Sequence, residues 1–372
     1  MFSKLKNFLV LILSILIIFI ILELISKQIR INRAGSTFIV TDPILHHRWK
    51  GNLNIVNKRP KYKLVTNSKG WLENYEVKKK KGKNTYRIFC VGDSNTQGLV
   101  DDEYKTCSSL EIKLNENYKS LPINFEIINT GTSSYSTLIY YLLIRDHLIE
   151  YNPDMVLLNI DMTDVPNDNF YNNFIIKDDE EKILAITPQK DTQDIKYELT
   201  PTGYRKIKRK KYYSKIIQNS DFLYLVERAI SRLIWKWKLN PNLNISQNYN
   251  EANWLKFEWD DKIEQNVIYS MSILDKITDL SIQEKFDLVV TSIPHLDQFN
   301  GKQSDQPHKI VESTMQKNNG NYFNLYEILS QKKNQEELSR LYLKNDPTHF
   351  NQSGNKVWAD LLFEYVIQRQ LY

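Results

Sequence analysis

The stretch Tyr86-Arg87-Ile88-Phe89-Cys90-Val91-Gly92-Asp93-Ser94-Asn95-Thr96 decides how the rest of this chain is interpreted. Its first six residues are largely apolar, which is typical of a buried strand. The glycine that follows favours a tight turn, and this turn exposes Ser94. Because serine is a weak nucleophile at neutral pH, it also needs a base within hydrogen-bond reach and an acid that orients this base.

A carboxylate and an imidazole lie three residues apart near the C-terminus, in Asn345-Asp346-Pro347-Thr348-His349. This spacing suits a compact loop in which Asp346 accepts from one ring nitrogen of His349 while the other ring nitrogen faces the serine. We therefore predict a triad of Ser94 as nucleophile, His349 as base and Asp346 as the acid that orients it. The alternative is that Gly-Asp-Ser is only a turn or a helix cap.

Short apolar runs alternate with helical patterns from residue 86 onward. This alternation predicts an α/β fold in which a parallel sheet is covered by helices on both faces, with the ligand site at the carboxyl ends of the strands. Helical patterns are found at 109–118 and 136–149. The predicted strands are 86–91, 125–129, 154–160, 287–292 and 322–325.

The first four predicted strands each end next to a candidate site residue, the first of them at Ser94. Gly131 follows the second strand, and its permissive backbone could expose an amide to an oxyanion. Thr163 follows the third strand, where it is either a site residue or the neighbour of a helix cap. His295 follows the fourth strand and is either bonded within the protein or in contact with substrate.

Together these motifs resemble the SGNH, or GDSL-type, superfamily of serine esterases and acyltransferases, over roughly residues 85 to 366. Gly92-Asp93-Ser94 resembles the first sequence block of that family, Gly131 the second, and Asp346-x-x-His349 the last. The resemblance implies a three-layer, flavodoxin-like fold with a central parallel sheet. It also implies that the amides of Ser94 and Gly131 hold the oxyanion together with a residue of the third block.

The third block departs from the family pattern. Thr163, in Met162-Thr163-Asp164, stands where the family carries an asparagine that helps to hold the oxyanion. Loss of one oxyanion donor typically costs on the order of 100- to 1000-fold in turnover. Asn159 or Asn167 could compensate.

An apolar run from Phe8 to Leu22, interrupted only by Ser14 and continued by Leu24-Ile25, predicts a helix of roughly 27 Å that nearly spans a bilayer. Residues 1–26 are therefore expected to be an uncleaved, single-pass membrane anchor, with the catalytic domain outside the cytoplasm. A cleaved signal peptide and a buried helix are the alternatives. We expect an approach segment at 27–84 that packs on the domain, and an SGNH-like domain at 85–372.

An insertion is expected from about 167 to 283, because this interval is too long for a simple crossover. Apolar residues recur at helical spacing between Phe222 and Trp237 with basic residues among them, which predicts either a lid helix or a helix lying on the membrane.

The net charge of +6 over 372 residues does not indicate nucleic-acid binding. No cofactor is implied, and no metal site, since His46-His47 lacks partners at ligand spacing.

The two cysteines, Cys90 and Cys107, have neither disulfide-framework nor metal spacing, so we expect two buried thiols.

The function predicted first is a membrane-anchored serine esterase that cleaves O-acyl esters of a cell-envelope polysaccharide or lipid. The resemblance favours O-acetyl groups. One alternative is an O-acyltransferase that uses the same serine, and the second is a catalytically silent envelope scaffold or glycan-binding protein. The sequence indicates no particular protein partner.

Overall fold

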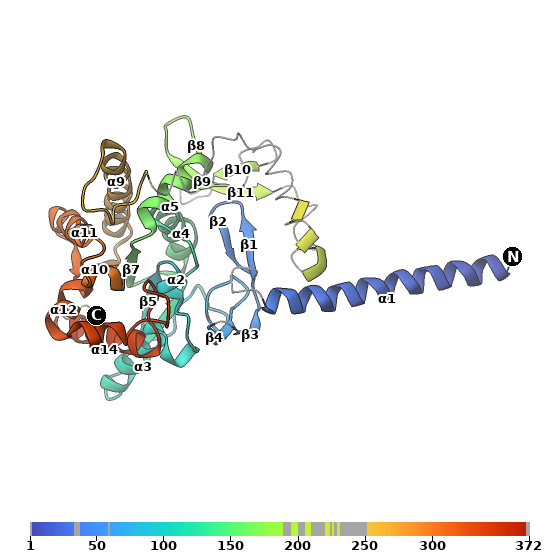
Figure 1. Ribbon diagram of the computed structural model, residues 1–372, viewed down its shortest axis with the longest axis horizontal. Helices are drawn as coiled ribbons and strands as arrows, with labels where there is room; N and C mark the ends of the chain where they lie inside the picture. Colours follow the sequence, from blue (N-terminus) through green and yellow to red (C-terminus); the bar gives the residue numbers. More distant parts are fainter. Residues whose placement is uncertain are drawn as a thin grey trace.

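The computed structural model describes residues 2–32, 38–58, 60–188, 195–199, 205–209, 220–223, 225–226, 229–230 and 251–369. At the centre of the domain in Figure 1 lies a five-stranded sheet in which every adjacent pair of strands is parallel. The spatial order β6-β5-β7-β12-β13 is the flavodoxin-like order, in which the strand sequence reverses beside the first strand. The α/β fold and all five predicted strands are thus confirmed. The strands are β5 Thr85–Val91, β6 Asn124–Asn129, β7 Met155–Asp161, β12 Asp287–Ile293 and β13 Asn321–Phe323.

Successive residues of the central strands face opposite layers, as the two-residue period of a strand requires. In β5, Ile88 and Cys90 pack in one apolar cluster, and Phe89 and Val91 pack in the other. Helices cover both faces, so the fold has three layers. The first cluster is completed by α3 Thr106–Asn117, α12 Leu325–Lys332 and α14 Gln352–Gln368, and the second by α4 Thr137–Leu143, α9 Asp261–Glu284 and α11 Gln306–Lys317.

Both helical patterns predicted from the sequence form helices, with different limits. The helix predicted at 109–118 is α3, which begins three residues earlier. The pattern at 136–149 is a regular α-helix only over α4. One π-helical turn, Ile144–Leu148, and one 3-10 turn, Ile149–Tyr151, continue it.

Residues before the first central strand form two antiparallel hairpins on the side of the domain. Beyond them, Trp71 packs edge-on against Phe89 of β5 and Tyr151. The Lys81 ammonium pairs with Asp154 at 2.6 Å. Apolar contacts and ion pairs therefore connect this segment to the sheet. The hairpins are β1 Ile39–Asp42 with β2 His46–Trp49, and β3 Asn54–Lys58 with β4 Lys61–Val65.

The N-terminal helix α1, Phe2–Asn32, projects away from the domain (Figure 1). Its segment Lys6–Lys27 is long and apolar enough to cross a membrane, with a mean hydropathy of 3.3.

The described part of the predicted insertion contains the short helix α5 Asp164–Tyr171, the hairpin of β8 Ile175–Lys177 with β9 Ile183–Ile186, and the hairpin of β10 Ile195–Leu199 with β11 Arg205–Arg209. Residues 221–223, 225–226 and 229–230 are helical. The rest of the amphipathic pattern predicted up to Trp237 lies outside the described residues.

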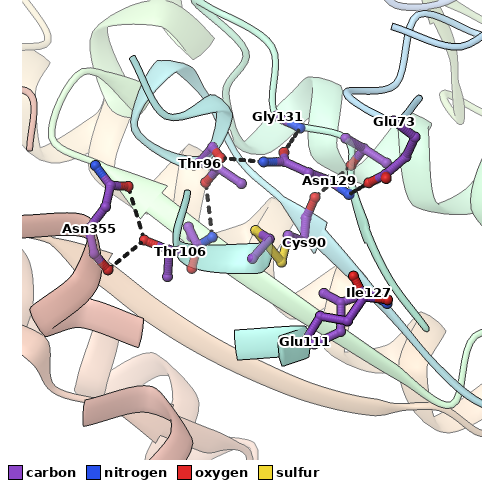
Figure 2. Close-up of a disulfide and its surroundings, with 12 residues drawn as sticks. Glu73, Cys90, Thr96, Thr106, Glu111, Ile127, Asn129, Gly131 and Asn355 are labelled. Carbon is purple, nitrogen blue, oxygen red and sulfur yellow. Dashed lines mark hydrogen bonds between the residues drawn. A yellow bond between two sulfur atoms is a disulfide. The ribbon is translucent and has the colours of Figure 1, made fainter. Parts of the chain in front are cut away.

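The expectation of two free thiols is wrong, because Cys90 and Cys107 are joined in a disulfide (Figure 2). Cys90 is near the end of β5 and Cys107 is in the first turn of α3. Their Cα atoms are 6.5 Å apart because α3 returns across the sheet beside β5. This proximity comes from the fold, and the spacing of two cysteines in the sequence does not encode it.

Candidate active site

Ser94 is the first residue of α2, Ser94–Gln97, a single helical turn directly after β5. Asp93 caps this turn, with its Oδ1 accepting from the Asn95 amide at 2.8 Å. Gly92 is required here, because a Cβ at this position would lie 2.0 Å from Thr96 Oγ1. Asn159 of β7 donates to the same Thr96 Oγ1 at 2.9 Å. The turn that contains Ser94 is thus fixed by its own Asp93 cap and by Asn159 of the neighbouring strand β7.

The structure brings together the three residues of the predicted triad. Ser94 Oγ lies 2.8 Å from His349 Nε2, and His349 Nδ1 lies 2.7 Å from Asp346 Oδ2. Partial burial opposes ionisation of Asp346, but hydrogen bonds from the Thr348 hydroxyl and amide outweigh it and lower the pKa of the carboxyl. An ionised Asp346 holds the proton of His349 on Nδ1, so Nε2 is free to accept the proton of the serine.

Ser94 has a second neighbour that the sequence did not indicate. Asp93 Oδ2 lies 3.0 Å from Ser94 Oγ, so the capping carboxylate also contacts the hydroxyl of this serine. Asp93 is buried, and its burial together with the nearby Asp161 carboxylate raises its pKa to about 7. The protonation state of Asp93 therefore changes within the physiological range of pH.

Gly131 has a different partner from the one predicted. Its amide donates to Asn129 Oδ1 at 2.9 Å, as drawn in Figure 2. A Cβ at Gly131 would lie 2.3 Å from the Gln97 backbone nitrogen, so the glycine allows its loop to approach α2 closely. In the same loop, Ser134 has a left-handed backbone with φ of 65°. Within the described part of the chain, neither the Ser134 amide nor the Ser94 amide has an assigned acceptor.

The Thr163 hydroxyl is also engaged. It donates to Asp161 Oδ1 at 2.7 Å, and the Thr163 amide donates to the same oxygen at 2.8 Å. A hydroxyl has a single hydrogen, so in this arrangement Thr163 has none left for an oxyanion. Asn159, considered as a substitute, uses one hydrogen of its amide group on Thr96.

The buried carboxylate of Asp161 connects the loops at this edge of the sheet. Its Oδ2 accepts from Asn95 Nδ2 at 2.9 Å and lies 3.3 Å from His295 Nε2. Asn95 also donates to the Thr348 carbonyl, next to His349. Burial opposes ionisation of Asp161, but His295 and the hydrogen bonds of Thr163 lower its pKa.

His295 lies inside this network and not at the surface, since only 3% of it is exposed. In the structure it is a partner of Asp161. Trp254, in the later part of the predicted insertion, donates through Nε1 to the Met162 carbonyl at 2.7 Å and supports the same loop. Within the described ranges, no three His, Cys, Asp or Glu side chains are arranged to hold a metal ion.

Comparison with known proteins finds no matching protein-family model and no matching curated protein. Among solved structures, an acetyl xylan esterase is 14% identical, with a TM-score of 0.41 and coverage of 75% of this chain and 99% of that chain. A lipase/acylhydrolase from Enterococcus faecalis is 11% identical, with a TM-score of 0.40 and coverage of 76% and 96%. A GDSL-like lipase from Bacteroides thetaiotaomicron is 12% identical, with a TM-score of 0.34 and coverage of 76% and 89%.

Proposed function

We propose that this protein is a serine esterase that cleaves O-acyl esters. The observation that carries the proposal is the continuous hydrogen-bonded chain from Ser94 through His349 to Asp346. Ser94 Oγ attacks the ester carbonyl carbon while His349 Nε2 takes the serine proton. The protonated imidazole is stabilised by the Asp346 carboxylate and then gives this proton to the leaving alcohol.

Deacylation repeats the same steps with water. His349 removes a proton from a water molecule, the resulting hydroxide attacks the acyl carbon on Ser94, and His349 returns the proton to Ser94 Oγ as the acid leaves.

For the oxyanion we propose the amide of Ser94, at the start of α2, as the first donor. Gly131 and Thr163, the two further donors predicted from the sequence, would have to give up Asn129 and Asp161 respectively. The unassigned amide of Ser134, in the loop after β6, is our candidate for the second donor. The Ser133 hydroxyl in this loop donates to Gln97 Oε1 of α2, so the loop touches the helix that begins with Ser94.

We further propose that α1 anchors the enzyme in a membrane and that the catalytic domain lies outside the cytoplasm. The disulfide between Cys90 and Cys107 supports this topology, because disulfides persist mainly in oxidising compartments. The resemblance of the motifs to anchored SGNH members favours an O-acetylated envelope glycan or lipid as substrate.

A silent scaffold is the second candidate, because Gly131 and Thr163 both have other partners in place of an oxyanion. An acyltransferase would use the same Ser94 but exclude water in favour of a sugar hydroxyl.

The test is hydrolysis of para-nitrophenyl acetate by the full chain in detergent micelles, with labelling by a serine-directed fluorophosphonate, in wild type and Ser94→Ala. Turnover and labelling that are both lost in the variant support the esterase. A folded wild type that neither labels nor turns over would establish the scaffold instead. Acetyl transfer to an added glycan, in preference to water, would identify an acyltransferase.

A further inference from the structure

Glu23 is an acidic residue within the apolar segment of α1. A carboxylate at the centre of a membrane-spanning helix costs about 3 kcal/mol by insertion scales, and acidic residues within apolar segments are usually paired. The structure supplies one from almost two hundred residues further along the chain.

Glu23 binds the beginning of a helix in the insertion. Its Oε2 accepts from the Ser220 hydroxyl at 2.7 Å and from the Phe222 amide at 3.0 Å, and its Oε1 accepts from the Asp221 amide at 2.5 Å. Ser220 Oγ in turn accepts from the Leu223 amide at 3.1 Å. The carboxylate thus satisfies two amides that a helix N-terminus leaves free, at the end where the helix dipole favours negative charge.

The contact partly covers one face of α1, on which Phe19 is 39% exposed. Phe19, Glu23 and Ser26 follow each other at helical spacing on this face. The ring of Phe19 meets that of Phe222 edge-on at 5.9 Å, and Ser26 is only 5% exposed. Leu24 and Ile25, on the other faces, are 63% and 51% exposed and remain available to lipid.

The same junction is tied to the domain. Lys50 Nζ, at the end of the first hairpin, lies 4.0 Å from Asp221 Oδ1. Figure 1 shows α1 leaving the domain next to β3, with the segment that begins at Ser220 beside its C-terminal half. Helix, insertion and domain therefore meet at one place.

We propose that Glu23 and residues Ser220–Phe222 form a clasp that holds the catalytic domain against the membrane surface, with lipid as the partner of the insertion. The inference rests on the membrane anchor proposed above. At 1.5 Å per residue, Glu23 lies about 6 Å and Phe19 about 12 Å from Lys27 at the end of the apolar segment. Phe222, which contacts Phe19, therefore reaches the boundary between headgroups and acyl chains, where interfacial helices bury their apolar side chains.

The clasp is tested by cysteine cross-linking of the full chain in lipid nanodiscs. The two native cysteines are already joined to each other, so Phe19→Cys with Phe222→Cys introduces a new pair. Mild oxidation is expected to link this pair, identified by mass spectrometry of the peptides. The matched pair Phe8→Cys with Phe222→Cys is expected to remain unlinked, because Phe8 lies about three helical turns deeper along α1. Addition of Glu23→Ala is expected to slow the first link at least tenfold.

The lipid contact is tested by a nitroxide on Phe222→Cys, which is expected to collide more with oxygen than with a water-soluble nickel complex. A nitroxide on Asp279→Cys, an exposed position of α9, is the solvent control. The proposal is overturned if the first pair does not link, if Glu23→Ala does not slow the link, or if the Phe222 label behaves like the control. Hydrolysis of para-nitrophenyl acetate is measured on the same samples. It is expected to be unchanged by Glu23→Ala, so a failure of the clasp is distinguishable from a failure of the esterase.

Discussion

The hydroxyl of Ser94 lies 3.0 Å from the carboxylate of Asp93, the residue that caps its own helix. The same hydroxyl is 2.8 Å from His349 Nε2, so a single hydrogen has two possible acceptors. When Asp93 is ionised it competes with the base for this hydrogen, and when it is protonated it does not. Since the pKa of Asp93 is raised to about 7, the competition begins near neutral pH.

We therefore expect Asp93→Asn to remove a decline in kcat/KM that the wild type shows above about pH 7. Asparagine keeps the capping oxygen for the Asn95 amide but has no proton to lose. The measurement is kcat/KM for para-nitrophenyl acetate from pH 5 to pH 9. Asp93→Ala is the matched variant that also loses the cap, and its unfolding free energy is expected to fall by about 1 kcal/mol. A decline above pH 7 that persists in Asp93→Asn would show that another group is responsible.

Thr163→Val is expected to change kcat by less than about threefold. The Thr163 hydroxyl hydrogen is directed at Asp161, and valine keeps the shape of the side chain and the backbone amide bond to Asp161. Removal of a working oxyanion donor would instead reduce kcat by about 100- to 1000-fold. Steady-state kinetics with para-nitrophenyl acetate separate the two cases, and a loss of the larger size would place Thr163 in the oxyanion hole.

The strands, and the proximity of Ser94, His349 and Asp346, could be predicted from the sequence because each depends on a local pattern. Buried parallel strands are short apolar runs, and residues that follow such strands meet at one edge of the sheet. Ser94 follows such a strand. His349 instead precedes the last helix, and the Asp346-x-x-His349 spacing is what pairs it with Ser94, 255 positions away.

The partners of individual polar groups could not be predicted in the same way. The Gly131 amide binds Asn129 two residues away, and Glu23 binds Ser220 on a distant element. Each choice depends on a few ångströms of packing that no sequence pattern encodes. The disulfide of Cys90 and Cys107 has the same origin, since it depends on where α3 crosses the sheet.

The double variant Cys90→Ala/Cys107→Ala is expected to lose about 3 kcal/mol of unfolding free energy, the typical effect of closing a loop of this length. The bridge joins the strand that leads to Ser94 with the first turn of α3, where Thr106 Oγ1 donates to Asn355 Oδ1 of α14 at 3.0 Å. Urea unfolding with and without a reductant gives the difference. Reductant should lower the unfolding free energy of the wild type but not that of the double variant. Equal unfolding free energies of the two proteins without reductant would mean that the disulfide does not form.

The ionisation of Asp168 is expected to lower the free energy of unfolding of the domain as pH rises. Burial raises the pKa of Asp168 to about 6, above its ordinary value of 3.8. The folded state therefore holds a proton between these two values that the unfolded state has already lost, and stability declines as pH increases through this window. Asp93 acts in the same direction up to about pH 7. We expect the melting temperature of the wild type to be higher at pH 5 than at pH 8.

Asp168→Asn tests this origin directly. Asparagine keeps an oxygen for the Leu138 amide, which now donates to Asp168 Oδ1 at 2.9 Å, and it replaces the second carboxylate oxygen by an NH2 group beside the hydroxyls of Ser136, Thr137 and Ser270. The variant removes a buried carboxylate that ionises as pH rises, so its melting temperature is expected to fall less between pH 5 and pH 8 and to exceed that of the wild type at pH 8. Asp279→Asn, on the exposed side of α9, should leave the pH dependence unchanged. Curves for wild type and Asp168→Asn that run parallel from pH 5 to pH 8 would mean that Asp168 keeps the same charge in both states of the protein.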